Sequence, residues 1–146
     1  MSDSYSLIIK NGSCFIKGKF QNIDLAISGN KIKKIGNISL NNAKVIDASG
    51  KIVLPGVIDT QVHFREPGAN DAENLESGSR AAVAGGVTSV FEMPNTNPPT
   101  STFKEFNNKL TAAKNRMFCN YAFYFGATPD NMKELSSVNT LDGCCG

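Results

Sequence analysis

The sequence predicts an α/β fold in which a parallel sheet with helical cover follows a small antiparallel β-structure. Residues 1–54 consist of short segments rich in β-branched residues and separated by turn dipeptides. From Pro55-Gly56 onward, strand-like and helix-like segments alternate instead. We therefore expect two parts, an N-terminal β-segment over residues 1–54 and strand–helix units over residues 55–146.

The N-terminal part contains four strand-like segments with turn residues between them. They cover residues 6–12, 15–21, 22–36 and 43–54. Asn11-Gly12 and Gly29-Asn30 are typical of tight hairpin turns, because these residues tolerate the positive φ that such turns require. This part offers no candidate catalytic group.

The C-terminal part consists of three successive units of strand and helix. Strands are predicted over residues 57–64, 87–94 and 120–127, the first of them buried. Helices are predicted over residues 73–86, from Thr102 and from Thr128. Strands that alternate with helices imply a parallel sheet covered by those helices.

Local signals mark the ends of these helices. The first helix stops at Gly85-Gly86. Thr102 and Glu105 form a capping box at the start of the second, and Pro129 suits the first position of the third. Apolar residues of the second helix recur at three- and four-residue steps. They form one buried stripe that consists of Phe103, Phe106, Leu110, Ala113 and Met117.

Three strand–helix units are fewer than a common α/β fold contains. A (β/α)8 barrel, for example, takes roughly 250 residues. We therefore expect residues 1–146 to be a fragment that is inactive alone, with an unpaired sheet edge beside the third strand.

Composition and charge exclude several classes of protein. The net charge is only +2 and the lysines are scattered, which argues against nucleic-acid binding. No stretch approaches the ~20 apolar residues that cross a bilayer, and the N-terminus lacks the regions of a signal peptide. We expect no nucleic-acid or membrane partner and a cytoplasmic location. The four cysteines show no CxxC spacing, so free thiols are expected.

Residues 57–68, which read VIDTQVHFREPG, carry the strongest candidate chemistry. Because side chains alternate along a strand, Asp59, Gln61, His63 and Arg65 share one face. His63 is the only histidine of the chain, and with Arg65 it falls at the C-terminal end of the strand, where catalytic groups gather in barrels. The imidazole of His63 can bind a metal, and the guanidinium of Arg65 can bind a carboxylate. Together they suit hydrolysis of an anionic substrate.

Simpler interpretations of the same residues stay open. A single histidine is more often packed or hydrogen-bonded than a metal ligand. Arg65 can form a surface ion pair with Glu66, and Asp59 can be a structural hydrogen-bond acceptor.

A second candidate is Asn95, in the segment EMPNTNPPT over residues 92–100. Asn95 directly follows the second strand, in a Pro-rich loop. Its side-chain amide has both a hydrogen-bond donor and an acceptor, so it can bind an amide or a carboxylate of a substrate. We expect it at the same rim of the sheet as His63.

Three segments, in this order and spacing, resemble the dihydroorotases of the amidohydrolase superfamily. They are LPGVIDTQVHFREPG at 54–68, AAVAGGVTSVFEMPNTNP at 81–98 and FYFGAT at 123–128. The N-terminal part is similar to the small β-sandwich that precedes the barrel in cyclic amidohydrolases. The resemblance implies the N-terminal part of a metal-dependent hydrolase (β/α)8 TIM barrel, with about three βα units, after a small β-sandwich segment.

The resemblance also implies roles for four residues. The metal motif of the family is His-x-His followed two residues later by Arg, and here it reads QVHFR over residues 61–65. His63 is then a metal ligand, Gln61 replaces the first histidine, and Arg65 contacts the substrate carboxylate. Asn95 is the second substrate contact. One or two Zn²⁺ ions are the implied cofactor. The family's lysine, further histidines and aspartate base are absent from this chain, so we expect no catalytic residue within it.

The implied reaction is the reversible hydrolysis of dihydroorotate, a small anionic cyclic amide, to N-carbamoyl-aspartate in pyrimidine biosynthesis. Gln61 is also typical of catalytically silent dihydroorotase-like subunits that support aspartate transcarbamoylase. Allantoinases and dihydropyrimidinases are a further alternative, although they lack arginine at the place of Arg65. We expect the whole protein to form a homo-oligomer or to associate with aspartate transcarbamoylase.

Overall fold

The computed structural model describes residues 4–39 and 42–146. By its internal contacts the chain divides into two compact units, Met1–Pro55 and Gly56–Gly146. Each unit has its own cluster of buried apolar side chains. The first unit is built from strands alone and the second from strands and helices.

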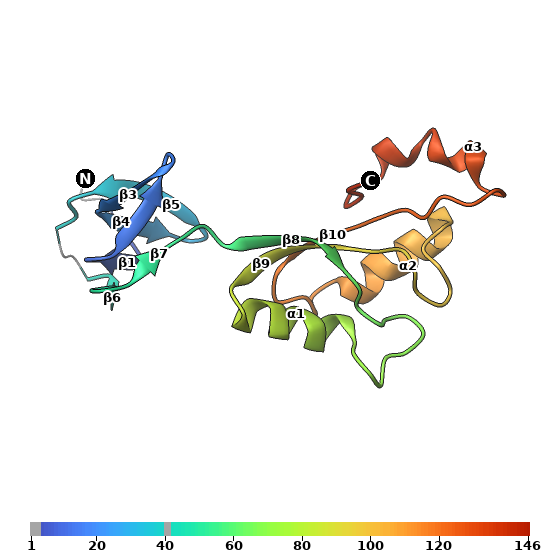
Figure 1. The fold of residues 1–146 in the computed structure, drawn as a ribbon, viewed down its shortest axis with the longest axis horizontal. Helices are drawn as coiled ribbons and strands as arrows, with labels where there is room; N and C mark the ends of the chain where they lie inside the picture. Colours follow the sequence, from blue (N-terminus) through green and yellow to red (C-terminus); the bar gives the residue numbers. More distant parts are fainter. Residues whose placement is uncertain (1–3, 40–41) are drawn as a thin grey trace. The chain divides into compact units, whose positions relative to one another are not determined.

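The first unit contains two sheets (Figure 1). The four-stranded sheet has the order β5 (Lys31–Gly36), β4 (Asp24–Ser28), β1 (Leu7–Lys10) and β6 (Lys44–Asp47). The three-stranded sheet has the order β3 (Lys19–Asn22), β2 (Ser13–Ile16) and β7 (Ile52–Val53). The prediction of an antiparallel structure is wrong for two pairs, because β6 runs parallel to β1 and β7 runs parallel to β2. The chain alternates between the sheets, so a later strand returns beside an earlier one in the same direction.

The two predicted hairpin turns have different outcomes. Gly29-Asn30 joins the antiparallel strands β4 and β5, and Gly29 has a φ of 60°, so this prediction is confirmed. Asn11 also has a positive φ, of 62°, but it leads from β1 into β2, which lies in the other sheet. The hairpin prediction is therefore wrong at Asn11-Gly12.

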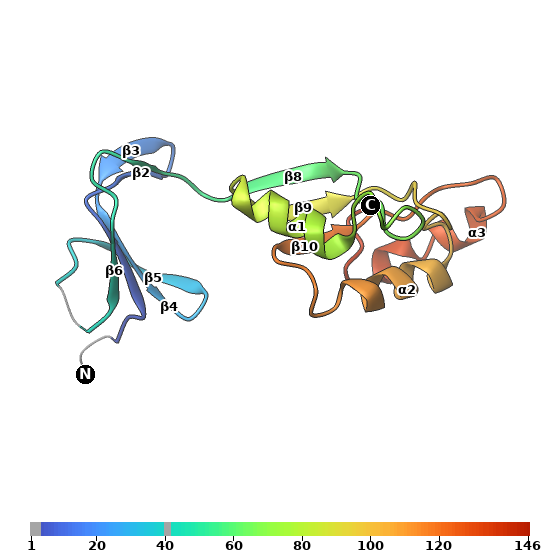
Figure 2. The same ribbon diagram turned by 90° about the horizontal axis from the view of Figure 1, so that it is seen from below.

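The second unit contains a parallel sheet with two helices on one side (Figure 2). The predicted parallel sheet with helical cover is confirmed. The central strand is β9, and β8 and β10 flank it. The elements are β8 (Val57–Val62), α1 (Leu75–Ala84), β9 (Val87–Glu92), α2 (Phe103–Ala113), β10 (Asn120–Phe123), α3 (Met132–Leu135) and the 3₁₀ turn Val138–Thr140.

The end of α1 and the N-cap of α2 are confirmed, but the capping box at α2 is only half formed, because the Glu105 side chain accepts from Asn108 and not from the Thr102 N–H. Gly85 is the C-cap of α1, and Thr102 is the N-cap of α2, where its hydroxyl accepts a hydrogen bond from the Glu105 N–H. The third helix was predicted to begin at Thr128-Pro129 and instead begins at Met132. The Asn131 side chain accepts from the Thr128 N–H and so holds the preceding residues in a turn.

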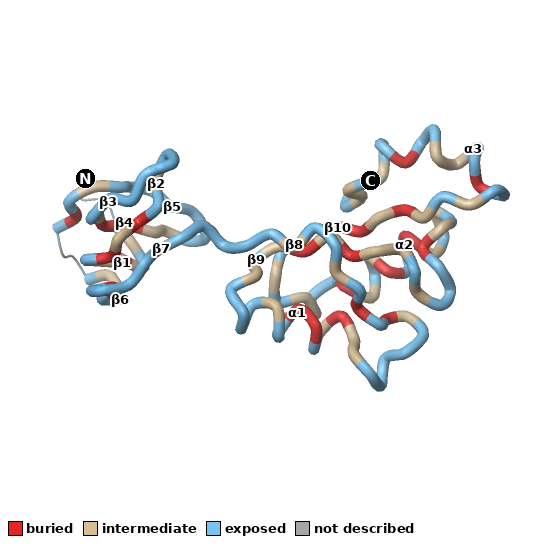
Figure 3. The backbone as a smooth tube through the Cα atoms, viewed as in Figure 1, coloured by how far each residue is buried: buried red, intermediate tan, exposed pale blue. Residues whose placement is uncertain are grey.

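A buried apolar cluster lies between the sheet and the two helices, as the red segments in Figure 3 show. Its fully buried members are Leu75, Val90, Phe106, Ala113 and Phe123. The prediction that residues 57–64 form a buried strand is wrong for β8, whose Val57 and Ile58 are 55% and 57% exposed. β8 is an edge strand, and helices cover only one of its faces.

The sheet edge beside β10 is partly paired, contrary to the expectation of an open edge. Phe123 N–H donates to the Gly143 carbonyl, and Cys145 N–H donates to the Phe123 carbonyl. A parallel bridge joins Phe123 to Cys144. Residues 143–146 therefore extend the ladder beyond β10.

Two further expectations concern the whole chain. The four cysteines are free thiols, as predicted. Among the helices in residues 4–39 and 42–146, none combines the length and apolarity needed to cross a bilayer.

Candidate functional site

The residues that follow β8 alternate between exposed and buried positions. His63 and Arg65 are exposed, whereas Phe64 and Glu66 are buried. Phe64 packs so closely on α1 that a side chain at Gly78 would lie 2.5 Å from its ring. The strand-like alternation thus turns one set of residues toward the helices and leaves the other at the carboxyl end of the sheet.

Glu66 is bound on the helix side rather than to its neighbour Arg65. Arg116 makes two parallel hydrogen bonds to the Glu66 carboxylate, of 2.7 and 2.9 Å, and the Leu75 N–H donates a third, of 3.0 Å. The alternative of an Arg65–Glu66 ion pair is therefore wrong. The hydrogen bonds from Arg116 lower the pKa of the Glu66 carboxyl, so this residue anchors the loop in its charged form.

The Arg65 side chain is exposed at this end of the sheet. It makes no ion pair and no side-chain hydrogen bond with any residue in the described ranges. Together with Asn95 it lines a pocket of about 200 Å³. The remaining lining residues are Phe64, Pro67, Gly68, Ala69, Thr96 and Asn97.

His63 contacts Asn95, as expected for groups at one rim. Its Nδ1 atom lies 2.9 Å from the Oδ1 atom of Asn95, although 32 residues separate the two in sequence. Both side chains are exposed. The structure thus brings His63, Arg65 and Asn95 to the ends of two adjacent strands.

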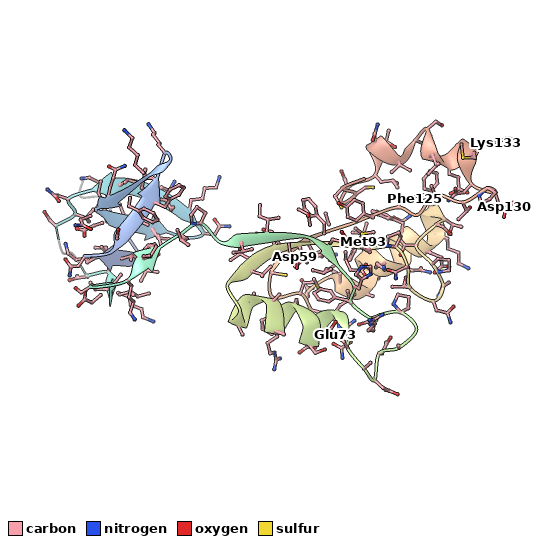
Figure 4. The ribbon with its side chains drawn as sticks, in the orientation of Figure 1. Asp59, Glu73, Met93, Phe125, Asp130 and Lys133 are labelled. Atoms are coloured by element: carbon pink, nitrogen blue, oxygen red, sulfur yellow. The ribbon has the colours of Figure 1, made fainter. Side chains whose placement is uncertain are left out.

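The loop that carries Asn95 is held by backbone hydrogen bonds. Thr96 N–H and Thr100 N–H both donate to the Pro94 carbonyl, each over 2.9 Å. Just before this loop, Met93 N–H donates to the Val62 carbonyl and so ties the end of β9 to the end of β8. Figure 4 labels Met93 in this region, with Asp59 on the neighbouring strand.

Gln61 lies on the exposed side of β8, and its amide makes no hydrogen bond with the described residues. Its backbone N–H donates to Oδ1 of Asp59 over 3.0 Å. Asp59 therefore serves as a structural acceptor, as the simpler interpretation predicted. A register shift in the β8–β9 ladder falls between Asp59 and Val62.

The described residues do not by themselves complete a zinc site. A zinc site takes at least three protein ligands, chiefly Cys, His, Asp or Glu. No cluster of three such residues with suitable geometry occurs in residues 4–39 and 42–146. His63 supplies one imidazole and Gln61 one neutral amide, so the metal role of both residues stays a prediction.

A buried ion pair on the helix side of the sheet was not predicted from the sequence. Lys109 Nζ lies 2.6 Å from Oε2 of Glu92, with the two side chains 1% and 0% exposed. Burial raises the pKa of the Glu92 carboxyl to about 7, although Lys109 and, more weakly, His63 oppose this rise. Burial also lowers the pKa of Lys109.

The position of Lys109 on α2 was the signal that could have revealed this pair. Lys109 follows Phe106 by three residues and precedes Ala113 by four, so it belongs to the buried stripe. Glu92 follows the buried Val90 by two residues on β9 and therefore shares its helix-facing side.

Parallel strand–helix units with polar groups at the carboxyl ends of the strands are the building units of (β/α)8 barrels, and in this chain they do not close into a barrel. The sequence pattern of the dihydro-orotase-like family matches residues 50–139. The chain belongs to this family, within the amidohydrolase superfamily.

Named relatives and a solved structure agree with this assignment. An allantoinase of Desulfitobacterium hafniense (strain Y51) is 39% identical over 136 residues, which cover 92% of this chain and 30% of the relative. A dihydroorotase of Aquifex aeolicus (strain VF5) is 46% identical over 119 residues, or 77% of this chain and 28% of the relative. The L-hydantoinase (dihydropyrimidinase) of Arthrobacter aurescens superposes with a TM-score of 0.84 at 30% identity, over 94% of this chain and 31% of that protein.

The chain thus spans about 30% of the length of the curated relatives that it matches. Its relatives carry the names of three cyclic amide hydrolases, so hydrolysis of a cyclic amide is the activity of the family around it.

Proposed function

We propose that the whole protein hydrolyses the ring amide of a small anionic substrate of the dihydroorotate class. The observation that carries this proposal is the unpaired guanidinium of Arg65 beside Asn95 at the carboxyl end of the sheet. A guanidinium binds a carboxylate through two parallel hydrogen bonds. A neutral ring gives Arg65 no comparable partner.

The chain's own residues have distinct tasks in this proposal. Arg65 binds the ring carboxylate, and Asn95 donates a hydrogen bond to the same group or to a ring carbonyl. Glu66, held by Arg116, keeps the backbone of the Arg65 loop in place. His63 offers an imidazole to a metal, and no group of three His, Cys, Asp or Glu side chains among the described residues completes that site.

A neutral substrate is the first alternative, and the names of the relatives favour it. Allantoinases are 38–39% identical to this chain, and hydantoinases have similar structures. Arg65 distinguishes the two possibilities, because only an anionic ring needs it.

A catalytically silent subunit is the second alternative, and Gln61 favours it. A neutral amide oxygen is a poorer zinc ligand than an imidazole nitrogen. We expect Gln61→His to raise the zinc content of the whole protein, measured by elemental analysis after dialysis. An unchanged zinc content would show that position 61 does not face a metal.

A direct test compares the whole protein on three substrates: dihydroorotate, allantoin and hydantoin. The proposal predicts ring opening of dihydroorotate and a kcat/KM at least tenfold lower for the two neutral rings. Activity on allantoin or hydantoin alone would transfer the assignment to the neutral-ring enzymes. A metal-free protein without turnover on any of the three would support the silent subunit.

A further inference from the structure

The contact between His63 and Asn95 links the hydrogen-bonding states of the two side chains. Nδ1 of His63 lies 2.9 Å from Oδ1 of Asn95. An amide oxygen can only accept a hydrogen bond, so Nδ1 carries the proton. In a neutral imidazole the other ring nitrogen, Nε2, then holds a free lone pair.

Backbone contacts fix the position from which Asn95 makes this hydrogen bond. The residue lies between Met93, whose N–H donates to the Val62 carbonyl, and Thr96, whose N–H donates to the Pro94 carbonyl. Val62 directly precedes His63 in the sequence. His63 and Asn95 therefore lie on two backbone segments that are joined by the hydrogen bond from Met93 to Val62, directly before His63.

Asn95 provides the one side-chain hydrogen bond that the His63 ring makes with the described residues. In residues 4–39 and 42–146, no second side chain forms a hydrogen bond with His63. Without Asn95, an exposed imidazole of this kind can rotate about its side-chain bonds and take either tautomer.

We propose that Asn95 is a positioning residue that holds His63 as the Nδ1–H tautomer and so leaves the Nε2 lone pair available to a cation. A ring nitrogen that binds a metal is commonly oriented by a hydrogen bond from the other nitrogen to an oxygen acceptor. The amide of Asn95 supplies that acceptor from the neighbouring strand.

The same contact decides what Asn95 offers to a ligand, and this consequence rests on the proposed function. Because Oδ1 accepts from His63, the ligand meets chiefly the N–H donors of Nδ2. Arg65 also carries donors only. The rim therefore favours ligand oxygens, such as a carboxylate or a carbonyl, over the N–H edge of a ring.

A single spectrum tests the positioning role, because the chain contains one histidine. The chain is labelled with ¹⁵N-histidine, and long-range ¹H–¹⁵N correlations are recorded at about pH 8.5, where an ordinary imidazole is neutral. We expect Nδ1 to have the shift of a protonated nitrogen and Nε2 that of an unprotonated one. The reverse assignment in the unmodified chain would overturn the proposal without any variant.

Three variants separate positioning from ligand contact. Asn95→Ala removes the acceptor and should move the ring toward the Nε2–H tautomer. Asn95→Asp keeps an acceptor oxygen and should retain the Nδ1–H tautomer. Asn97→Ala, in the same loop, should leave the spectrum unchanged. A spectrum of Asn95→Ala that matches the unmodified chain, with its backbone amide signals also unchanged, would overturn the positioning role.

Steady-state kinetics of the whole protein test separately whether the N–H donors of Asn95 contact the substrate. Asn95→Asp keeps the acceptor for His63 but replaces the N–H donors by a negative charge. We expect its KM for dihydroorotate to rise at least tenfold. An unchanged KM would overturn the donor role of Asn95 and the proposed substrate contact, whereas the positioning role is decided by the spectrum alone.

Discussion

The two sides of the segment after β8 differ in how completely their polar groups are satisfied within the chain. On the helix side, Glu66 accepts three hydrogen bonds and Phe64 packs on α1. On the exposed side, within the part of the chain that the structure describes, the Arg65 side chain makes no hydrogen bond or ion pair, and the His63 ring makes one hydrogen bond, to Asn95. Alternate residues of this short segment therefore have different environments. Phe64 and Glu66 anchor the loop to the helices, whereas His63 and Arg65 are exposed.

The same division holds one strand further along. Glu92, at the end of β9, faces the helices and pairs with Lys109, whereas Asn95, three residues later, reaches the exposed rim. In both segments a charged pair on the helix side lies within three residues of an exposed rim residue. Substitutions on the helix side should therefore lower stability, and substitutions at the rim should change ligand binding with little effect on stability.

The largest expected effect is at Lys109. Lys109→Ala leaves the Glu92 carboxylate buried without its cation, so the free energy of unfolding should fall by about 3–5 kcal/mol at about pH 8. Urea denaturation of the chain, followed by circular dichroism, measures this change. Lys104→Ala is the matched control, because Lys104 is exposed on the same helix, and it should change stability by less than about 0.5 kcal/mol. Equal effects of the two substitutions would contradict the comparison.

A pH dependence of stability should follow from Glu92. Its pKa is about 7 in the folded chain against an ordinary value of 4.5, so the folded state holds more protons between these values. Stability should therefore fall as the pH rises through this window, by up to about 3 kcal/mol. The double variant Glu92→Leu with Lys109→Leu should remove this slope. Denaturation curves at several pH values test it, and an equal slope in both proteins would disprove the assignment to Glu92.

The outline of the fold could be predicted from the sequence because it depends on local signals. The turn at Gly29-Asn30, the end of α1 at Gly85 and the cap at Thr102 each follow from the conformational preferences of one or two residues. The strand pairings in the first unit could not be predicted, because the parallel return of β6 and β7 depends on crossings between sheets rather than on turn residues.

The candidate site was only partly predictable for a similar reason. The positions of His63 and Arg65 follow from strand alternation. The partners of Glu66 and Glu92 do not, because Arg116 and Lys109 lie 50 and 17 residues away in sequence and only the fold brings them together.

A smaller effect is expected at Arg116. Arg116→Ala removes two charge-assisted hydrogen bonds from Glu66, so stability should fall by about 2 kcal/mol near neutral pH. The pKa of Glu66 is lowered in the folded chain, so its contribution is present above its ordinary value of 4.5 and is lost as the pH falls through the folded value. The difference between the variant and the unmodified chain should therefore shrink in acid. A difference that stays constant down to the acid transition would mean that this pair does not anchor the loop.

The smallest effect on stability is expected at Arg65, where a substitution should instead weaken binding of the substrate carboxylate. Arg65→Ala should change the free energy of unfolding by less than about 0.5 kcal/mol, because Arg65 is exposed and makes no ion pair with any described residue. In the whole protein the same substitution should lower kcat/KM for dihydroorotate at least 100-fold, since roughly 3 kcal/mol of carboxylate binding is lost. Arg80→Ala, a control on the surface of α1, should leave kcat/KM unchanged. An Arg65→Ala protein with unchanged stability and unchanged kcat/KM for dihydroorotate would contradict the account.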